Sequence, residues 1–367
     1  MKVLVVVGTR PEAIKMAPVV LRLRAEAGFE TVVCATAQHR DLLDSALALF
    51  GIVPDIDLDL MRPNQTPSAV AAGVLSAFDG FLGEVSPHVV LVQGDTTTVM
   101  AASLACFHRG VPVGHVEAGL RTANLRNPFP EEMNRRVTDL VASVHFAPTA
   151  RSAAALAREG IDPATIHVTG NTVVDALRWL AERSPEADGD PRDLVLVTSH
   201  RRESFGEPMR RSFRAIARLA QRFPETRFVF PVHPNPNVLE AARAFEGIGN
   251  VELRPPVDYA QLVAWMRRAM IILTDSGGIQ EEAPTFGKPT LVLRETTERP
   301  EGIEAGVARL VGTDEETIYR EAERLLSDPS ALAAMSRPAN PYGDGKAAER
   351  IVAVLAGRPM TPFSAGA

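Results

Sequence analysis

The feature that most constrains the fold is a repeated alternation of short hydrophobic runs with longer helix-like segments. The first run, Val3–Val7, is rich in β-branched residues and ends at Gly8. Further runs lie at Thr31–Thr36, His88–Asp95, Val111–Glu117, Leu194–Ser199, Arg227–Val232 and Ile271–Thr274. Continuous hydrophobic runs are typical of strands buried on both faces, and strand–helix alternation favours a parallel sheet. We therefore predict an α/β fold.

The length and the position of one polar stretch predict two domains. With 367 residues the chain exceeds the usual size of one domain. Ser184–Arg192 is its poorest hydrophobic stretch and is the expected linker. We predict a Rossmann-like domain at 1–183, a second one at 193–345, and a C-terminal helix and tail at 346–367 that packs back on the first. The two doubly wound domains are expected to face each other across a cleft.

Charge and composition exclude several classes of partner. The 39 Lys and Arg residues are outnumbered by 45 Asp and Glu residues, so we expect no binding to nucleic acid. The cysteines, Cys34 and Cys106, lie in hydrophobic segments and lack C-x-x-C spacing, which indicates buried free thiols. No run approaches the ~20 hydrophobic residues of a membrane span, and the N-terminal run is too short for a signal peptide. We expect a cytoplasmic protein without membrane contact.

The stretch Ile271–Glu282 predicts an anion site at the end of a strand. Ser276, Gly277 and Gly278 follow the hydrophobic run and precede a polar helix-like segment. Glycines allow a ligand close to the backbone, and the first N–H groups of a helix favour phosphate. Glu282 stands one turn beyond and is placed to accept hydrogen bonds from ribose hydroxyls. The alternative is that the two glycines form a packing turn.

Three carboxylates follow the strands or loops of the first half. Asp95 and Glu117 each end a hydrophobic run, and Glu131 lies in a long proline-broken loop. Carboxyl ends of parallel strands meet at one sheet edge, so these acids are expected to converge there. Alternatively, Asp95 is an N-cap of the following helix, and Glu131 is a solvated loop residue.

Two cations stand at the first strand-to-helix turn. Arg10 and Lys15 are placed to reach a ligand above the sheet edge, although either is equally suited to a solvated surface. The chain has no Walker A sequence and no G-x-G-x-x-G after its first strand. His115 and Glu117 lack a third ligand at diagnostic spacing. We therefore expect no metal and no cofactor.

Several motifs together resemble those of the non-hydrolysing UDP-N-acetylglucosamine 2-epimerases. The resemblance spans nearly the whole chain. Its motifs are Gly8–Pro18, Gly94–Thr98, Gly114–Thr122, Pro130–Glu132, His200–Ser204, Thr274–Glu282 and Asn340–Gly345.

The resemblance implies a GT-B-like fold, a homodimer, and interconversion of UDP-GlcNAc and UDP-ManNAc. It further implies elimination of UDP to 2-acetamidoglucal followed by re-addition. The implied catalytic residues are Asp95, Glu117, Glu131 and His200, with Arg135 orienting Glu131. The implied UDP contacts are Arg10, Lys15, Ser276, Gly277, Gly278, Glu282 and Arg299.

The same resemblance implies a second, activating UDP-GlcNAc site and leaves other functions open. Its implied residues are Gln38, Arg201, Glu203 and His233, while Ser199 replaces a glycine that the family commonly has. One alternative is a hydrolysing epimerase that releases ManNAc and UDP. Others are a GT-B glycosyltransferase and a nucleotide-sugar-binding regulator without catalysis.

Overall fold

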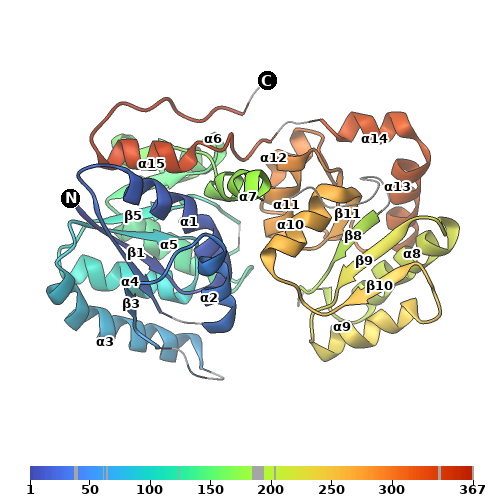
Figure 1. The fold of residues 1–367 in the computed structure, drawn as a ribbon, viewed down its shortest axis with the longest axis horizontal. Coiled ribbons are helices and arrows are strands. Elements are labelled where there is room, and N and C mark those ends of the chain that lie inside the picture. The colour runs from blue at the N-terminus through green and yellow to red at the C-terminus, as the bar shows by residue number, and fades with distance from the viewer. Residues whose placement is uncertain are drawn as a thin grey trace. The chain divides into compact units, whose positions relative to one another are not determined.

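The chain forms two compact units, each described here by itself (Figure 1). The computed structural model describes residues 1–36, 40–60, 62, 65–122, 124–183, 194–201, 204–337 and 340–365, excluding the side chains of Arg40 and Asp41. The first unit comprises Met1–Trp179 and Tyr342–Ala365, and the second comprises Leu180–Pro341. The expected linker, Ser184–Arg192, lies outside the described residues.

The first unit is built on a seven-stranded sheet in the order β3-β2-β1-β4-β5-β6-β7. Every pair of neighbouring strands is parallel. The strands are β1 Lys2–Val7, β2 Glu30–Ala35, β3 Ile56–Asp57, β4 Val89–Gln93, β5 Val113–Val116, β6 Val144–Ala147 and β7 Ile166–Val168. The order makes β1, β4 and β5 neighbours, so the loops after these strands meet at one edge.

Helices connect these strands, and one helix returns from the end of the chain. They are α1 Arg10–Ala25, α2 Arg40–Leu49, α3 Pro67–Val85, α4 Thr97–His108, α5 Glu131–Val141, α6 Ala150–Arg158, η1 Pro163–Thr165, α7 Thr172–Arg183 and α15 Ala347–Leu355. The boundary between the units falls within α7. Figure 1 shows α15 in red beside α1 in blue, and the two helices are in contact.

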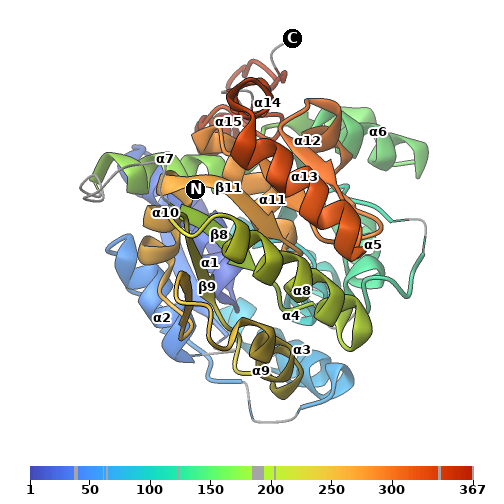
Figure 2. The ribbon, with the colours of Figure 1, turned by 90° about the vertical axis from the view of Figure 1, so that its right-hand side faces the viewer.

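The second unit has a six-stranded parallel sheet in the order β10-β9-β8-β11-β12-β13. Its strands are β8 Leu194–Thr198, β9 Arg227–Pro231, β10 Val251–Arg254, β11 Ala269–Thr274, β12 Thr290–Val292 and β13 Ala308–Leu310. Its helices are α8 Glu207–Arg222, α9 Pro236–Ala241, η3 Ala242–Phe245, α10 Tyr259–Arg268, α11 Gly277–Glu282, η4 Ala283–Phe286, α12 Pro300–Glu304, α13 Glu315–Ser327 and α14 Pro329–Met335. Figure 2 shows α8 and α13 side by side.

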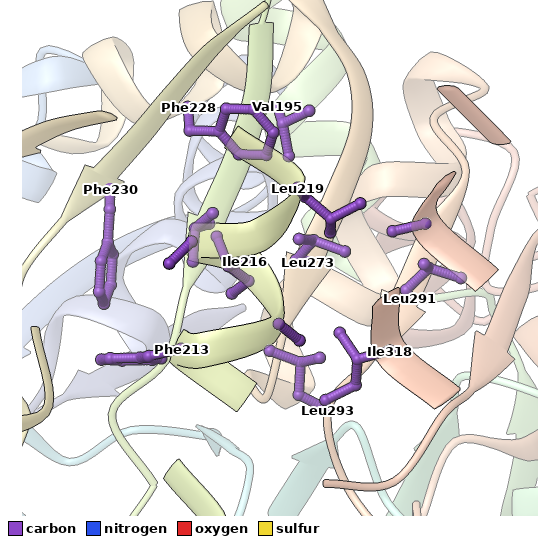
Figure 3. Close-up of a cluster of buried hydrophobic side chains, with 14 of the residues drawn as sticks. Val195, Phe213, Ile216, Leu219, Phe228, Phe230, Leu273, Leu291, Leu293 and Ile318 are labelled. Atoms are coloured by element: carbon purple, nitrogen blue, oxygen red, sulfur yellow. The ribbon is translucent and has the colours of Figure 1, made fainter. Parts of the chain in front are cut away.

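The central strands of the second sheet are buried on both faces. Val195 and Val197 point into a cluster with Phe213, Ile216 and the residues around them (Figure 3). The alternate residues of the same strand, Leu194 and Leu196, belong to a separate cluster that includes Met266 and Ile279. This arrangement explains why β8 reads as an uninterrupted hydrophobic run rather than an alternating one. The predicted α/β fold with two doubly wound sheets is confirmed.

One helix corrects the expectation that no segment resembles a membrane span. By length and composition alone, α3 is apolar enough to cross a membrane. Its buried face, which includes Val74 and Phe78, packs in the core of the first unit, and Asp79 pairs with Arg109 of the loop after α4. A helix that covers a large core meets the same compositional test, so this one is weak evidence for a span.

Two smaller expectations can be compared with the structure. Cys34 and Cys106 are buried free thiols as predicted, and burial raises the pKa of each to about 12. The C-terminal tail, expected to pack back on the first domain, contacts the end of β7 through Phe363. Phe363 is buried, and its N–H donates to the Val168 carbonyl at 2.8 Å.

Candidate active site

Asp95 follows β4 and is held in place by helix α5. Arg135 donates to its carboxylate through two nitrogens, with Nε at 3.1 Å. Asn134 donates to the Asp95 carbonyl at 2.9 Å. The side chain of Asp95 is 29% exposed, so it is oriented by these bonds while still reaching solvent. The alternative that Asp95 caps the following helix is wrong, because Thr96 is the N-cap of α4 and accepts from Val99 N–H.

Glu117 follows β5 and combines burial with an uncommon backbone conformation. Its φ of 66° lies in the left-handed region, which costs a non-glycine residue of order 1–3 kcal/mol. Its carboxylate pairs with Lys15 and accepts from Gln93 Nε2 at 2.9 Å. Lys15 and Glu117 are both almost fully buried. Lys15 therefore neutralises Glu117 directly, while its predicted contact with UDP stays a prediction.

Glu131 begins α5, one turn before Arg135. It is half-buried, and as an acidic residue in the first turn it is favourable to the helix dipole. The ion-pair partners of Arg135 are Asp95 and Glu132, so Arg135 acts on Asp95. That Arg135 also orients Glu131 remains a prediction. The two positions nevertheless share one face of the helix.

Arg10 is the first residue of α1, next to the N-cap Thr9. It is half-exposed, and its side chain makes no hydrogen bond or ion pair with the described residues. This is the arrangement expected of a cation available for an anionic ligand, and also of a solvated residue.

In the second unit, the predicted strand–turn–helix at 271–282 is present. β11 ends at Thr274, Ser276 is the N-cap of α11, and the helix spans six residues before η4 begins. A Cβ at Gly277 would lie 2.6 Å from Arg299 Nη1, so a larger residue there would displace this guanidinium. Gly278 has more room, as its nearest contact would be Glu282 Oε1 at 3.4 Å. Glu282 is buried at the end of this helix.

Buried Asp275 anchors the loop that carries His200. Its carboxylate accepts from Ser199 Oγ at 2.8 Å and from the backbone N–H groups of His200 and Arg201 at 2.9 and 3.0 Å. Ser199 thus contributes a hydrogen bond that glycine could not make. The ring of His200 is exposed and stacks on His233, with ring centroids 6.1 Å apart.

Arg299 belongs to a cluster of alternating charges. Its Nε lies 2.6 Å from Glu281 and its Nη1 2.8 Å from Glu298. Burial alone would raise the pKa of Glu298, but the charges of Arg299, Arg294 and Arg201 outweigh it and lower the pKa to about 2. The guanidinium of Arg299 is therefore held in position by two carboxylates rather than swinging freely.

The remaining predicted residues are partly outside the described part of the chain. Gln38 and Glu203 lie outside the described residues. Arg201 and His233 are described, and Arg201 Nη2 lies 3.9 Å from Glu298. No group of three His, Cys, Asp or Glu side chains suited to a metal occurs among the described residues. His115 was considered above as a metal ligand. Its two ring nitrogens instead face the Asp139 carboxylate and the Gly94 carbonyl.

Sequence reasoning missed Gln93, Asn134 and the contact of His115 with Gly94, all at the candidate carboxylates or the backbone beside them. It also missed Asp139, which pairs with His115. Gln93 and His115 are polar residues within hydrophobic strands, a signal that could have marked them. Asn134 and Asp139 lie among other polar residues of α5 and carry no such signal.

Comparison with known proteins places these residues in a family. A model described as UDP-N-acetylglucosamine 2-epimerase matches residues 21–356. The chain is 51% identical over 369 residues to a probable UDP-N-acetylglucosamine 2-epimerase of Ralstonia nicotianae, covering 96% of this chain and 98% of that protein. It is 50% identical over 369 residues to the UDP-N-acetylglucosamine 2-epimerase of Escherichia coli K12, covering 97% and 98%.

A solved structure extends the similarity to three dimensions. The crystal structure of UDP-GlcNAc 2-epimerase from Neisseria meningitidis bound to UDP-GlcNAc matches with a TM-score of 0.93 and 45% identity, covering 98% of this chain and 100% of that chain. The chain belongs to the UDP-N-acetylglucosamine 2-epimerase family.

Proposed function

We propose that this protein interconverts UDP-GlcNAc and UDP-ManNAc without net hydrolysis, by eliminating UDP to 2-acetamidoglucal and adding it back. Its relatives at about half identity over nearly the full length are named as 2-epimerases. The observation that carries the proposal is that Asp95 and Glu117 follow adjacent parallel strands, while Glu131 begins α5, the helix whose Arg135 pairs with Asp95.

The chemistry of the sugar explains why several carboxylates are needed. The C2 proton is not next to a carbonyl and is weakly acidic, so cleavage of the C1–O bond must lead. Inversion at C2 requires removal of a proton from one face and delivery to the other, which calls for more than one acid or base. We assign these roles to Asp95, Glu117 and Glu131.

The leaving diphosphate requires positive charge that is already in place. We assign its contacts to Arg10, Lys15, Arg299 and the Ser276–Gly278 turn, with His200 near the leaving phosphate and Glu282 on the ribose. Two of these cations have carboxylate partners, Lys15 with Glu117 and Arg299 with Glu281 and Glu298. A phosphate that draws Lys15 away would leave Glu117 a stronger base, which links UDP departure to proton transfer.

An activating UDP-GlcNAc site remains a separate proposal. We assign it to Gln38, Arg201, Glu203 and His233. The stacking of His233 on His200 is the described contact that connects this site with a proposed catalytic residue. The expected sign of activation is a sigmoidal dependence of rate on UDP-GlcNAc, which His233→Ala would make hyperbolic.

We also propose a cytoplasmic homodimer. The free buried thiols Cys34 and Cys106 suit a reducing compartment. Exposed hydrophobic side chains of the neighbouring helices α4 and α5, Phe107, Met133 and Leu140, suit an interface with a second copy. Leu140→Glu is expected to lower the mass measured by light scattering to that of a monomer, whereas Leu239→Glu, at a solvent-exposed position of α9, serves as the control.

Time-resolved proton NMR in D2O tests the reaction. We expect UDP-ManNAc to accumulate from UDP-GlcNAc, with deuterium at C2 of the product. Free ManNAc and UDP without UDP-ManNAc would instead establish a hydrolysing enzyme. Binding of UDP-GlcNAc with no turnover would establish a binding protein.

A further inference from the structure

His115 lies in the middle of β5 and is completely buried between β4 and β6. Its Nδ1 is 2.6 Å from the Asp139 carboxylate, and its Nε2 is 2.7 Å from the Gly94 carbonyl. Asp139 comes from α5, and Gly94 immediately precedes Asp95. The ring therefore connects the helix with the turn that presents Asp95.

The two contacts decide where the hydrogens of this ring are. A neutral imidazole has one donating and one accepting nitrogen. The Gly94 carbonyl can only accept, so Nε2 donates. Asp139 also accepts from Arg121 at 2.7 Å, as a carboxylate does. Burial alone would raise the pKa of Asp139, but His115 and Arg121 outweigh it and lower the pKa. Nδ1 therefore also faces an acceptor, and both ring nitrogens have a partner within the first unit.

A second buried histidine lies beside His115. His145 is the strand neighbour of His115 in β6, and its Nε2 donates to the Asp139 carbonyl at 2.8 Å. Burial lowers the pKa of His145, which keeps this second ring neutral. Among the described residues, His115 pairs with Asp139, and Asp139 also pairs with Arg121.

Three groups of the Gly94–Asp95 turn accept hydrogen bonds from side chains of β5 and α5. His115 holds the Gly94 carbonyl, Asn134 holds the Asp95 carbonyl, and Arg135 holds the Asp95 carboxylate. Gly94 has a φ of 80°, a conformation that leaves its carbonyl directed toward the ring. We propose that His115 and Asp139 are positioning residues that fix this turn and thereby aim Asp95, resting on the catalytic role assigned to Asp95 above.

Asp139 also reaches the second carboxylate-bearing loop. Arg121, which pairs with Asp139 and Glu159, donates through Nη1 to the Leu120 carbonyl at 2.8 Å. Leu120 lies three residues beyond Glu117. One buried aspartate thus joins the loop after β4, through His115, to the loop after β5, through Arg121. This connection couples the placement of the two acids.

The hydrogen on Nε2 of His115 can be detected without substrate. In protein labelled with 15N histidine, Nε2 of His115 is expected to carry a hydrogen, because the Gly94 carbonyl can only accept. A resolved Nε2–H correlation that is lost in His115→Gln would assign the signal. An Nε2 without a hydrogen would overturn the proposal, whether or not the protein proves to be an epimerase.

A pair of substitutions separates positioning from packing. Glutamine places its amide near the Nε2 position and keeps a donor for Gly94, whereas asparagine places its amide near Nδ1 and loses that bond. We expect kcat to fall about tenfold or more in His115→Asn and less than about threefold in His115→Gln, with KM and UDP affinity little changed. His145→Gln is the matched control, since it alters a buried strand histidine that does not hold Gly94.

The outcomes distinguish this inference from the proposed function. If the wild-type protein does not epimerise UDP-GlcNAc, the proposed function fails, and the NMR result alone decides the state of the ring. If the wild-type protein is active and the control lowers kcat as much as His115→Asn does, the effect is one of packing and the positioning role is overturned. Equal losses in His115→Asn and His115→Gln would overturn it too.

Discussion

Gly8 ends β1 at a point where three buried side chains converge. A Cβ at this position would lie 2.7 Å from Thr36 Oγ1 and 3.4 Å from both Glu12 Oε2 and Thr98 Cγ2. Glu12 accepts from the Gly8 N–H at 2.6 Å. The hydroxyls of Thr36 and Thr98 and the second oxygen of Glu12 have no hydrogen-bond partner among the described residues. This pocket favours a neutral carboxyl group over a carboxylate.

Glu12 is expected to make stability depend on pH. Burial raises the pKa of its carboxyl from 4.5 to about 7. Between these values the folded protein keeps a proton that the unfolded chain has lost, so stability falls as pH rises through this window, by roughly 3 kcal/mol for the full shift. Glu12→Gln cannot titrate and should remove this part of the loss.

Fluorescence of the two tryptophans can localise the measurement. Trp179 lies in the first unit and Trp265 in the second. In a Trp265→Phe background, Trp179 reports unfolding of the unit that contains Glu12. We expect the unfolding midpoint to fall less between about pH 5 and about pH 8 in Glu12→Gln than in the parent. Glu84→Gln, an exposed carboxyl of the same unit, should leave the pH dependence unchanged.

Asp95→Asn is expected to lower kcat by at least about 10²-fold while UDP affinity stays near that of the wild type, because general acid–base assistance is lost. Asp79→Asn is the control, since it removes the same charge from an exposed pair with Arg109. Steady-state kinetics and calorimetry with UDP check the two values. A parallel loss of UDP binding would show that Asp95 supports the binding surface instead.

Arg10→Ala is expected to weaken UDP binding about tenfold, the loss of one charge-assisted contact with phosphate. Arg22→Ala, on the same helix but paired with Glu26, is the matched control. Calorimetry with UDP measures the affinity of both variants. If Arg10→Ala and the wild type bind UDP with equal affinity, Arg10 is a solvated surface residue and does not contact UDP.

At the scale of elements, Arg350 of α15 connects three segments of the first unit. Its guanidinium donates to the Thr169 carbonyl at 2.9 Å, to both oxygens of Asp344 at 2.7 Å, and to the Thr361 carbonyl at 2.8 Å. These bonds join the loop after β7, the turn before α15 and the tail. A lysine has one point charge and cannot reproduce this fork.

Arg350→Lys should therefore destabilise the first unit by about 1–3 kcal/mol and expose the tail to carboxypeptidase. Arg358→Lys is the control, because Arg358 makes a single pair with Glu26 and is half exposed. Limited proteolysis followed by mass spectrometry measures the release of the tail. Protection equal to that of the control would mean that Phe363 alone holds the tail.

Elements differed in how far the sequence could predict them. Strands such as β1 and β8 could be predicted, because a strand that is buried on both faces has a continuous run of hydrophobic residues. β3 and β13 are two and three residues long, too short for any periodic pattern, and were missed. Glu131 is placed in a proline-broken loop by its sequence but begins α5, since the preceding prolines hide the first turn of the helix.

The sequence also predicted only part of the candidate site. Motif positions identified Asp95 and Glu117, whereas their partners depend on sheet order and crossover geometry. Arg135 meets Asp95 across 40 positions of sequence, and Lys15 meets Glu117 across 102. No local pattern encodes such pairs.

At the scale of the whole molecule, the proposed function assigns UDP contacts to both units. Saturating UDP should then stabilise both, by about 2.7 kcal/mol at a concentration a hundred times Kd. Single-tryptophan variants, Trp265→Phe and Trp179→Phe, report the two units separately. A shift in the unfolding of the second unit alone would remove Arg10 and Lys15 from the UDP site.

The segment Tyr342–Ala365 belongs to the first unit although it follows the whole of the second. A nascent chain leaving the ribosome therefore exposes the α1 surface that α15 will cover long before α15 has been synthesised. The second unit is continuous in sequence and can be completed first. Translation that stalls after the second unit has left the ribosome, but before α15 has emerged, should leave the first unit open to chaperones and proteases while the second can already fold.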